Sequence, residues 1–300
     1  MRKGGLLALL VAVAPLASAQ SLEPRAYSAS PVGLNFALAA YSHSKGDVGF
    51  DPSVPLENGQ ARVDSLALAY VRTLDLLGNS GSVGFVLPFA HFSGSATANG
   101  IEQSRDISGG ADPVLRVAVN FYGAPAMTKA QFASYRQDLI VGASLTVTAP
   151  AGQYDPTRIV NLGTNRWSAK PELGLSQALG PWTFELSGAV TVFTRNDDYF
   201  GGNVREQDPI YSTQLHVTRQ LGRGMWAAAS ATYYEGGRSS LNGVARDDRL
   251  SGSRFGATFA LPLGGGHSLK FFANTGIYAR TGTDFDTVGV AWQYLWGGGL

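Results

Sequence analysis

Hydrophobic and polar residues alternate along most of this 300-residue chain. The stretch Trp182-Thr183-Phe184-Glu185-Leu186-Ser187 shows the pattern, because its bulky apolar side chains share one face while its hydroxyls and carboxylate share the other. A period of two indicates a β-strand whose two faces meet different surroundings. Strands with lipid on one side and a polar interior on the other have this pattern, so it predicts an all-β fold, a transmembrane antiparallel β-barrel.

Twelve alternating segments of this kind follow one another, each bounded by turn residues. Each has about 10 to 13 residues, close to the roughly 9 to 11 that cross a bilayer as a tilted strand. An even number of strands returns the chain to the side of the membrane from which it started, as in bacterial outer-membrane barrels. The expected strands are 32–43, 61–73, 82–92, 112–122, 137–148, 166–177, 182–194, 209–220, 225–235, 252–262, 268–280 and 286–296.

The connections between these segments alternate in length. Those after even-numbered segments include the short turns 178–181 and 221–224. Short periplasmic turns and long external loops are typical of outer-membrane barrels, whereas a soluble β-sandwich or propeller has no reason to sort its loops in this way. The longer connection 123–136 is an exception, and we expect a short helix in it. The long loops after odd-numbered segments are 44–60, 93–111, 149–165, 195–208 and 236–251.

Aromatic residues fall at the ends of the expected strands. Trp182 and Trp226 open two strands at the end with the short turns, and Tyr41 and Tyr211 lie at the opposite end. Amphipathic rings collect at the level of the lipid headgroups, so this placement predicts an aromatic girdle at each membrane interface. Pro171 has no N–H for the strand ladder, and we expect a β-bulge there.

Charged residues are expected inside the barrel, on the face opposite the apolar one. A charge in a lumen must be paired or hydrated. Two interpretations remain open, namely a ladder of ion pairs that fills and rigidifies the lumen, or a constriction that selects solutes. The signs are mixed, so we expect no strong preference for anions or cations. The lumen-facing charges assigned by parity are Arg116, Asp138, Arg166, Lys170, Glu172, Glu185, Lys270 and Arg280.

The third long loop, 149–165, is expected to fold into the pore. It leads directly into Arg166 and Lys170, and the next external loop carries Glu206 and Asp208. These carboxylates are placed to meet the cations of the neighbouring strand if both loops turn inward. Our hypothesis is a gate in which these charges pin the third loop and narrow the pore.

Composition supports an exported protein. The chain has no cysteine, and its 23 basic residues nearly balance its 22 acidic ones, which argues against a nucleic-acid partner. A basic start, an apolar run and the small residues Ala17-Ser18-Ala19 predict a signal peptide over residues 1–19. Residues 20–300 would then form one barrel in the outer membrane of a Gram-negative bacterium. Its partners would be outer-membrane lipid, the outer-membrane insertion machinery and a small-molecule permeant.

No arrangement of residues in the sequence points to catalysis or to a metal. His43, His91, His216 and His267 lie in or beside different expected strands, with no partner at metal-ligand spacing. No G-x-S-x-G nucleophile motif is present. We therefore expect no enzyme, no catalytic residue, no metal and no cofactor. A Ser/His pair assembled from separate strands stays open, because the sequence does not show which strands bring their side chains together.

Several stretches resemble a known family. They are Leu22–Ser28 before the first expected strand, Pro150–Asp155 in the third long loop, Asn161–Gly174 leading into the sixth strand, and Glu206–Tyr211. Through them the chain resembles the outer-membrane β-barrel family of phenol meta-pathway degradation transporters, over essentially its whole mature length. The resemblance implies a barrel that is often encoded with aromatic-compound catabolism and that takes up hydrophobic or aromatic substrates. It implies no catalytic residues.

The preferred interpretation is a monomeric twelve-stranded channel for passive or facilitated uptake of small hydrophobic or aromatic compounds. Three alternatives stay open, namely a general diffusion porin for small polar solutes, an outer-membrane hydrolase or acyltransferase, and a structural barrel with a filled lumen. Twelve strands enclose a narrower interior than the roughly 16 to 18 strands of porins, so side chains inside the lumen decide whether it is open.

Overall fold

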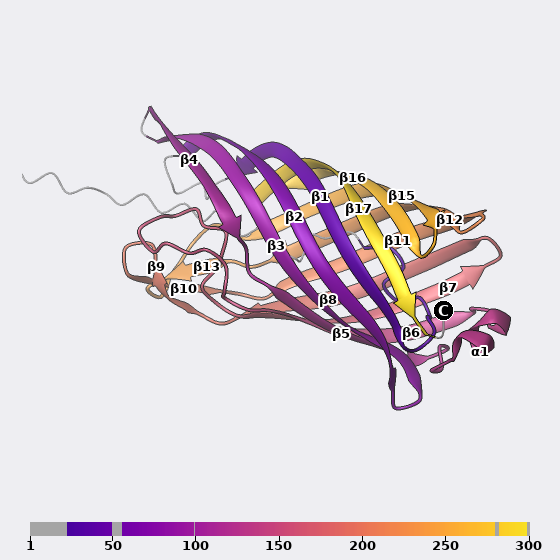
Figure 1. Ribbon diagram of the computed structural model, residues 1–300. Coiled ribbons are helices and arrows are strands. Elements are labelled where there is room, and N and C mark those ends of the chain that lie inside the picture. Colours follow the sequence, from indigo (N-terminus) through magenta and orange to yellow (C-terminus); the bar gives the residue numbers. More distant parts are fainter. Residues whose placement is uncertain (1–22, 50–55, 99, 280–281, 299–300) are drawn as a thin grey trace, which may run out of the picture.

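Twelve antiparallel strands form a closed barrel in the computed structural model, which describes residues 23–49, 56–98, 100–279 and 282–298 (Figure 1). Every expected strand is confirmed, and neighbours in the barrel are also neighbours along the chain. The barrel strands are β1 (Leu34–Gly49), β2 (Leu56–Leu76), β3 (Asn79–Ala98), β5 (Val114–Tyr122), β6 (Leu139–Thr148), β7 (Ser168–Leu179), β8 (Trp182–Phe193), β11 (Ile210–Gly222), β12 (Met225–Gly236), β15 (Leu250–Gly264), β16 (His267–Ala279) and β17 (Gly282–Gly297). The ring is closed where β1 pairs with β17.

The alternation seen in the sequence separates the outside of the barrel from its inside. On β8, Phe184 is 40% exposed and Leu186 is 47% exposed, whereas Glu185 between them is 3% exposed. On β7, Leu173 is 64% exposed and Ser176 is fully buried. Large apolar side chains thus form the outer surface, where a soluble protein would carry polar ones.

Two local expectations were wrong. The ladders that join β7 to β6 and β8 keep one register on both sides of Pro171, so no bulge forms. Trp226 lies at the strand end, at the depth expected for the aromatic girdle, but its side chain does not point toward lipid. It shares parity with the buried Ala228 and Ser230 of β12, so its ring faces the lumen. A strand end gives the depth of a side chain, whereas parity gives the face on which it lies.

The two ends of the barrel differ (Figure 1). At one end, 123–138 holds the expected short helix, α1 (Lys129–Ser134), which begins at a capping box formed by Thr128 and Gln131. At the other end β3 runs on and pairs with β4 (Ile101–Gly110), so much of the expected loop 93–111 is a β-hairpin. Within the described residues, no helix is long and apolar enough to cross a membrane. A small sheet at this end contains β9 (Asn196–Tyr199), β10 (Asn203–Gln207), β13 (Ser239–Leu241) and β14 (Val244–Ala245).

Buried apolar clusters lie at both ends of the barrel. Under the long hairpins, Phe92, Ile107 and Leu162 pack in one buried cluster with residues of β1, β2 and β17. At the end that carries α1, Ala29 and Ile140 pack with residues of the 123–138 connection. Since Leu162 comes from the third long loop and Ala29 precedes β1, segments outside the barrel wall supply part of each cluster.

Candidate functional site

The chain before β1 folds into the barrel. Val32 donates its backbone N–H to Met127 at 2.8 Å, which anchors this segment beside α1, and Gly33 donates to Thr73 at 3.1 Å. Further from the anchor, Arg25 donates its backbone N–H to the carboxylate of Glu185, the fourth residue of β8, at 2.5 Å. The N-terminal segment, residues 23–33, therefore occupies the half of the lumen nearest α1.

Tyr27 holds the centre of the N-terminal segment. Its hydroxyl donates to Oε1 of Glu172 on β7 at 2.8 Å and lies 3.5 Å from Oγ of Ser144 on β6. The side chain is 2% exposed. Its ring fits against Gly142 and Gly174, because a Cβ built at either glycine would lie within 2.4 Å of a ring carbon. Only a strand residue without a side chain leaves room for this ring.

Arg25 gives the N-terminal segment a second attachment. Its guanidinium carbon lies 5.4 Å from the ring centroid of Trp226, at a distance suited to a cation–π interaction. The inward direction of Trp226 thus has a structural reason, since the ring meets a residue of the segment rather than lipid. Glu185, expected in the lumen from parity, is buried there and accepts the Arg25 backbone N–H.

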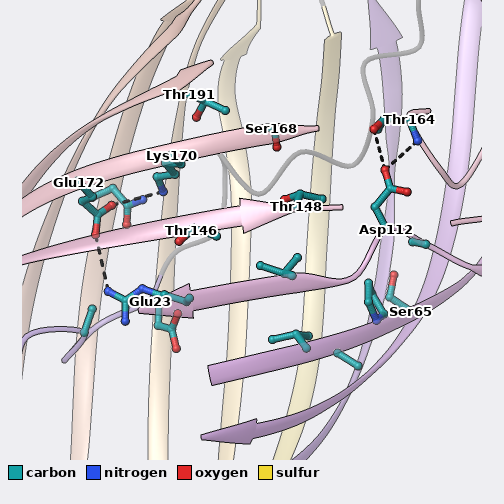
Figure 2. A pocket seen from close by; sticks show the side chains of 18 of the residues that line it. Glu23, Ser65, Asp112, Thr146, Thr148, Thr164, Ser168, Lys170, Glu172 and Thr191 are labelled. Atoms are coloured by element: carbon teal, nitrogen blue, oxygen red, sulfur yellow. Dashed lines mark hydrogen bonds and ion pairs between the residues drawn. The ribbon is translucent and has the colours of Figure 1, made fainter. Parts of the chain in front are cut away.

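A cavity of about 440 Å³ lies between the N-terminal segment and the third long loop. Glu23 and Tyr27 line it from the segment, and Leu162 and Thr164 line it from the loop. Figure 2 shows the side chains that border it. A cavity of about 150 Å³ is enough to hold benzene in a protein interior, so the volume suits one-ring compounds.

The two sides of the cavity differ in chemistry. The side formed by β2, β3 and β5 carries mainly apolar side chains, whereas the side formed by β6, β7, β8 and β11 carries hydroxyls, an amide and a histidine together with the charged Lys170, Glu172 and Glu185. Such a wall suits a solute with an apolar body and one polar group. The apolar members include Ala67, Val86, Ala90 and Val114. The polar members include Thr146, Thr148, Ser168, Ser187, Thr191, Gln214 and His216.

Asp112, rather than the expected charges, holds the third long loop over the cavity. Its carboxylate accepts the backbone N–H of Gly152 at 2.8 Å. It also accepts the N–H and the hydroxyl of Thr164 at 2.8 and 2.7 Å (Figure 2). Asp112 is 6% exposed. Two ends of the loop are therefore fixed to one buried carboxylate at the start of β5, and hydrogen bonds to a charged acceptor are among the strong ones in proteins.

The outer part of this loop is ordered by its own hydrogen bonds. The Thr157 hydroxyl and backbone N–H donate to Asp155 at 2.6 and 2.9 Å, and they hold the pKa of that carboxyl below its ordinary value. Asn161 accepts the Asp155 N–H at 2.9 Å and donates to the Arg158 carbonyl at 3.0 Å. These hydrogen bonds within the loop fix the conformation of its outer part.

The expected pairing of Arg166 with Glu206 or Asp208 does not occur among the described residues. Arg166 is 3% exposed, donates to the amide oxygen of Gln207 and lies 4.3 Å from the ring centroid of Phe193. Glu206 on β10 and Asp208 just after this strand are both exposed. Successive side chains along an extended chain point to opposite faces. Since Gln207 points inward to Arg166, the side chains directly before and after it point away from Arg166.

Of the remaining expected lumen charges, Lys170 and Glu172 form an ion pair, and Lys270 lies near the N-terminal segment. Glu172 accepts from Lys170 Nζ at 3.3 Å and lies 4.0 Å from Arg116 (Figure 2). Lys270 has Glu23 of the N-terminal segment as an electrostatic neighbour. Arg280 lies outside the described residues, as does the expected signal peptide. The lumen therefore holds mixed charges that neutralise one another locally, and no group of three metal-ligating side chains occurs in the part of the chain that the structure describes.

Arg166→Ala is expected to lower the thermal stability of the folded barrel and to make its single-channel current noisier. The change removes a buried cation from an aromatic ring and a donor from Gln207, at a cost of about 2–4 kcal/mol. Arg195→Ala is the control, because Arg195 forms an exposed pair with Asp197 at 2.7 Å and exposed pairs contribute little. Heat-dependent gel mobility and planar-bilayer recordings measure both effects, and equal behaviour of the two variants would contradict the expectation.

Reasoning from the sequence missed Tyr27, Arg25 and Asp112. For Asp112 a signal existed, because it shares parity with the inward Val114 and Arg116 of β5. For the other two there was none in the alternation, since the N-terminal segment is not a strand and its contacts are long-range.

Comparison with solved structures gives matches over nearly the whole chain. The COG4313 outer membrane channel from Pseudomonas putida F1 is 23% identical, with a TM-score of 0.79 over 92% of this chain and 100% of that one. The transport unit of the autotransporter AIDA-I from Escherichia coli is 8% identical, with a TM-score of 0.54 over 92% and 94% of the two chains. These likenesses concern the fold. A comparison with curated proteins found no match.

The closed barrel, its apolar outer surface and its likeness in fold to outer-membrane proteins place the chain in the outer membrane. The model of one protein family matches residues 42–292, which is most of the chain. The resemblance noted in the sequence is thereby confirmed: the chain belongs to the family described as "Putative MetA-pathway of phenol degradation".

Proposed function

We propose that this protein is an outer-membrane channel through which small hydrophobic or aromatic compounds enter by passive or facilitated diffusion. The observation that carries the proposal is the cavity of about 440 Å³ inside the barrel, with an apolar side and a polar, hydroxyl-rich side. An aromatic ring with one polar substituent can place each part against a matching wall. The family description, which names phenol degradation, supports the same class of solute.

The charges in the lumen support the uptake of neutral solutes. Glu172 has Lys170 and Arg116 beside it, and Glu23 of the N-terminal segment has Lys270, so each of these carboxylates has a cation nearby. Such an arrangement leaves no extended field of one sign to attract ions. Passage then requires that the N-terminal segment move, because Tyr27 and its neighbours fill the lumen on the side of α1.

The proposal predicts that the reconstituted protein transports a small aromatic alcohol faster than a sugar. Proteoliposomes are exposed to 4-hydroxybenzyl alcohol or to arabinose, two neutral solutes of similar size, and swelling rates are compared after subtraction of the rates for protein-free liposomes. We expect the aromatic alcohol to enter several-fold faster, because only its ring gains from the apolar wall.

Other outcomes of this measurement identify two of the other candidate functions. Equal rates for both solutes indicate a general diffusion porin, and rates equal to those of protein-free liposomes indicate a structural barrel. Either result overturns the proposal, provided that the gel shift on boiling has first established that the protein is folded.

A further inference from the structure

We propose that Tyr27 occupies a binding site for phenolic compounds, and that such a compound opens the channel by taking the place of the tyrosine ring. This inference rests on the proposed function, since it names the site at which the channel recognises its solute. A tyrosine side chain is p-cresol joined to a backbone, so the contacts that Tyr27 makes are those available to a free phenol.

The hydroxyl of Tyr27 is recognised by a charged acceptor. It donates to Oε1 of Glu172 at 2.8 Å, with the Ser144 hydroxyl 3.5 Å away. Glu172 is held in turn by Lys170 at 3.3 Å and Arg116 at 4.0 Å. The acceptor is therefore positioned by the barrel wall and remains in place when the tyrosine leaves, which is the condition for a preorganised site.

The ring of Tyr27 has a matching seat. Gly142 on β6 and Gly174 on β7 pair directly with each other, and together they leave a flat surface against which the ring lies. The Arg116 guanidinium carbon lies 5.9 Å from the ring centroid, within the range of a cation–π interaction. The two glycines, Arg116 and Glu172 all belong to strands of the barrel wall, so their positions do not depend on the N-terminal segment.

A solute can reach this site from the cavity that the structure contains. Tyr27, Arg116 and Glu172 all line the cavity of about 440 Å³, so a phenol that enters the cavity meets the edge of its own site. The tethered ring and the free phenol then compete for one acceptor. Binding of the phenol stabilises the state in which the N-terminal segment has left, and it shifts the population of channels toward that state.

Calorimetry on the full mature protein in detergent tests the binding site. Tyr27→Ala vacates the site, and we expect it to bind p-cresol saturably and at least about tenfold more tightly than 4-methylanisole, which has no O–H. A hydrogen bond to a charged acceptor is worth at least this factor. The matched control is Tyr27→Ala combined with Glu172→Leu, which keeps similar volume but removes the acceptor and is expected to abolish the difference.

Planar-bilayer recordings of the unmodified protein test the opening. We expect p-cresol to raise the open probability, and 4-methylanisole at the same concentration to leave it unchanged. Equal effects of the two solutes, or equal affinities for Tyr27→Ala, overturn the inference. If Tyr27→Ala does not fold, the recordings of the unmodified protein test the inference by themselves.

The inference and the proposed function fail in different ways. Faster entry of the aromatic alcohol into proteoliposomes, together with no preference for p-cresol over 4-methylanisole, overturns only the phenol site. Phenol-specific binding to Tyr27→Ala without solute entry overturns the proposed function and supports the site.

Discussion

Gly174→Ala is expected to raise the conductance of the folded channel several-fold. A Cβ at this position would lie 2.1 Å from Cε2 and 2.4 Å from Cδ2 of Tyr27. The backbone of β7 cannot retreat, because Gly174 pairs with Gly142 on one side and Ser187 on the other. The tyrosine ring must therefore leave, and the N-terminal segment loses the contacts that hold it in the lumen.

The size of this effect follows from the cost of overpacking. Forcing an extra methyl group into a filled site costs about 1–3 kcal/mol, and a bias of this size changes a two-state equilibrium by about 5- to 150-fold. Planar-bilayer recording measures both the mean conductance and the fraction of time that the channel is open.

Gly188→Ala is the matched control for this variant. Gly188 lies on the adjacent strand β8, and no atom comes within 4 Å of a Cβ built there. It is exposed on the outer face, so the added methyl group meets lipid rather than the N-terminal segment. Unchanged conductance of a correctly folded Gly174→Ala protein would show that the ring of Tyr27 does not close the channel.

Asp112→Ala is expected to release the third long loop and to speed its cleavage by trypsin at Arg158 more than tenfold. The loop loses three hydrogen bonds to one buried carboxylate, from Gly152 and Thr164. Hydrogen bonds to charged groups contribute about 1.5–3 kcal/mol each. Cleavage of a folded protein follows the population of the locally opened state, which rises as these bonds are lost.

The measurement is made on proteoliposomes in which the outer loops face the solution, and the fragment that ends at Arg158 is followed over time. Asp197→Ala is the control, since Asp197 is an exposed acidic residue of another external connection and pairs only weakly with Arg195. We also expect larger current fluctuations from Asp112→Ala, because Leu162 and Thr164 line the cavity. Equal cleavage rates in the two variants would show that Asp112 does not hold the loop.

The twelve strands could be predicted because every membrane-spanning strand must alternate between apolar residues that face lipid and polar residues that face the lumen. Phe184, Glu185 and Leu186 must alternate between lipid and lumen whatever the neighbouring strands are. The same rule gave the inward direction of Lys170 and Glu172. It was insufficient for Trp226, where the depth of the residue was interpreted without its parity, and for Pro171, where the ladder keeps its register without a bulge.

The gate predicted from Arg166, Glu206 and Asp208 shows that the positions of charges in the sequence do not by themselves predict which side chains pair. Opposite charges close in the sequence suggest ion pairs, but β10 directs Gln207 inward, and both Glu206 on this strand and Asp208 just after it are exposed. The loop is held instead by Asp112, whose partners Gly152 and Thr164 lie 40 and 52 residues further along the chain. Nothing in the local pattern selects these partners, because backbone N–H groups are present at every non-proline residue.

The sequence by itself determined the barrel, the number of its strands, the face on which most strand side chains lie and the family. These properties follow from periodicity and from stretches of sequence, both of which are local. Only the tertiary structure decided that the lumen is filled by the N-terminal segment, that Tyr27 fits between two glycines and Glu172, and that a cavity with two unlike sides remains. Those properties depend on contacts between residues more than a hundred positions apart, which the closing of the barrel brings together and which no local pattern encodes.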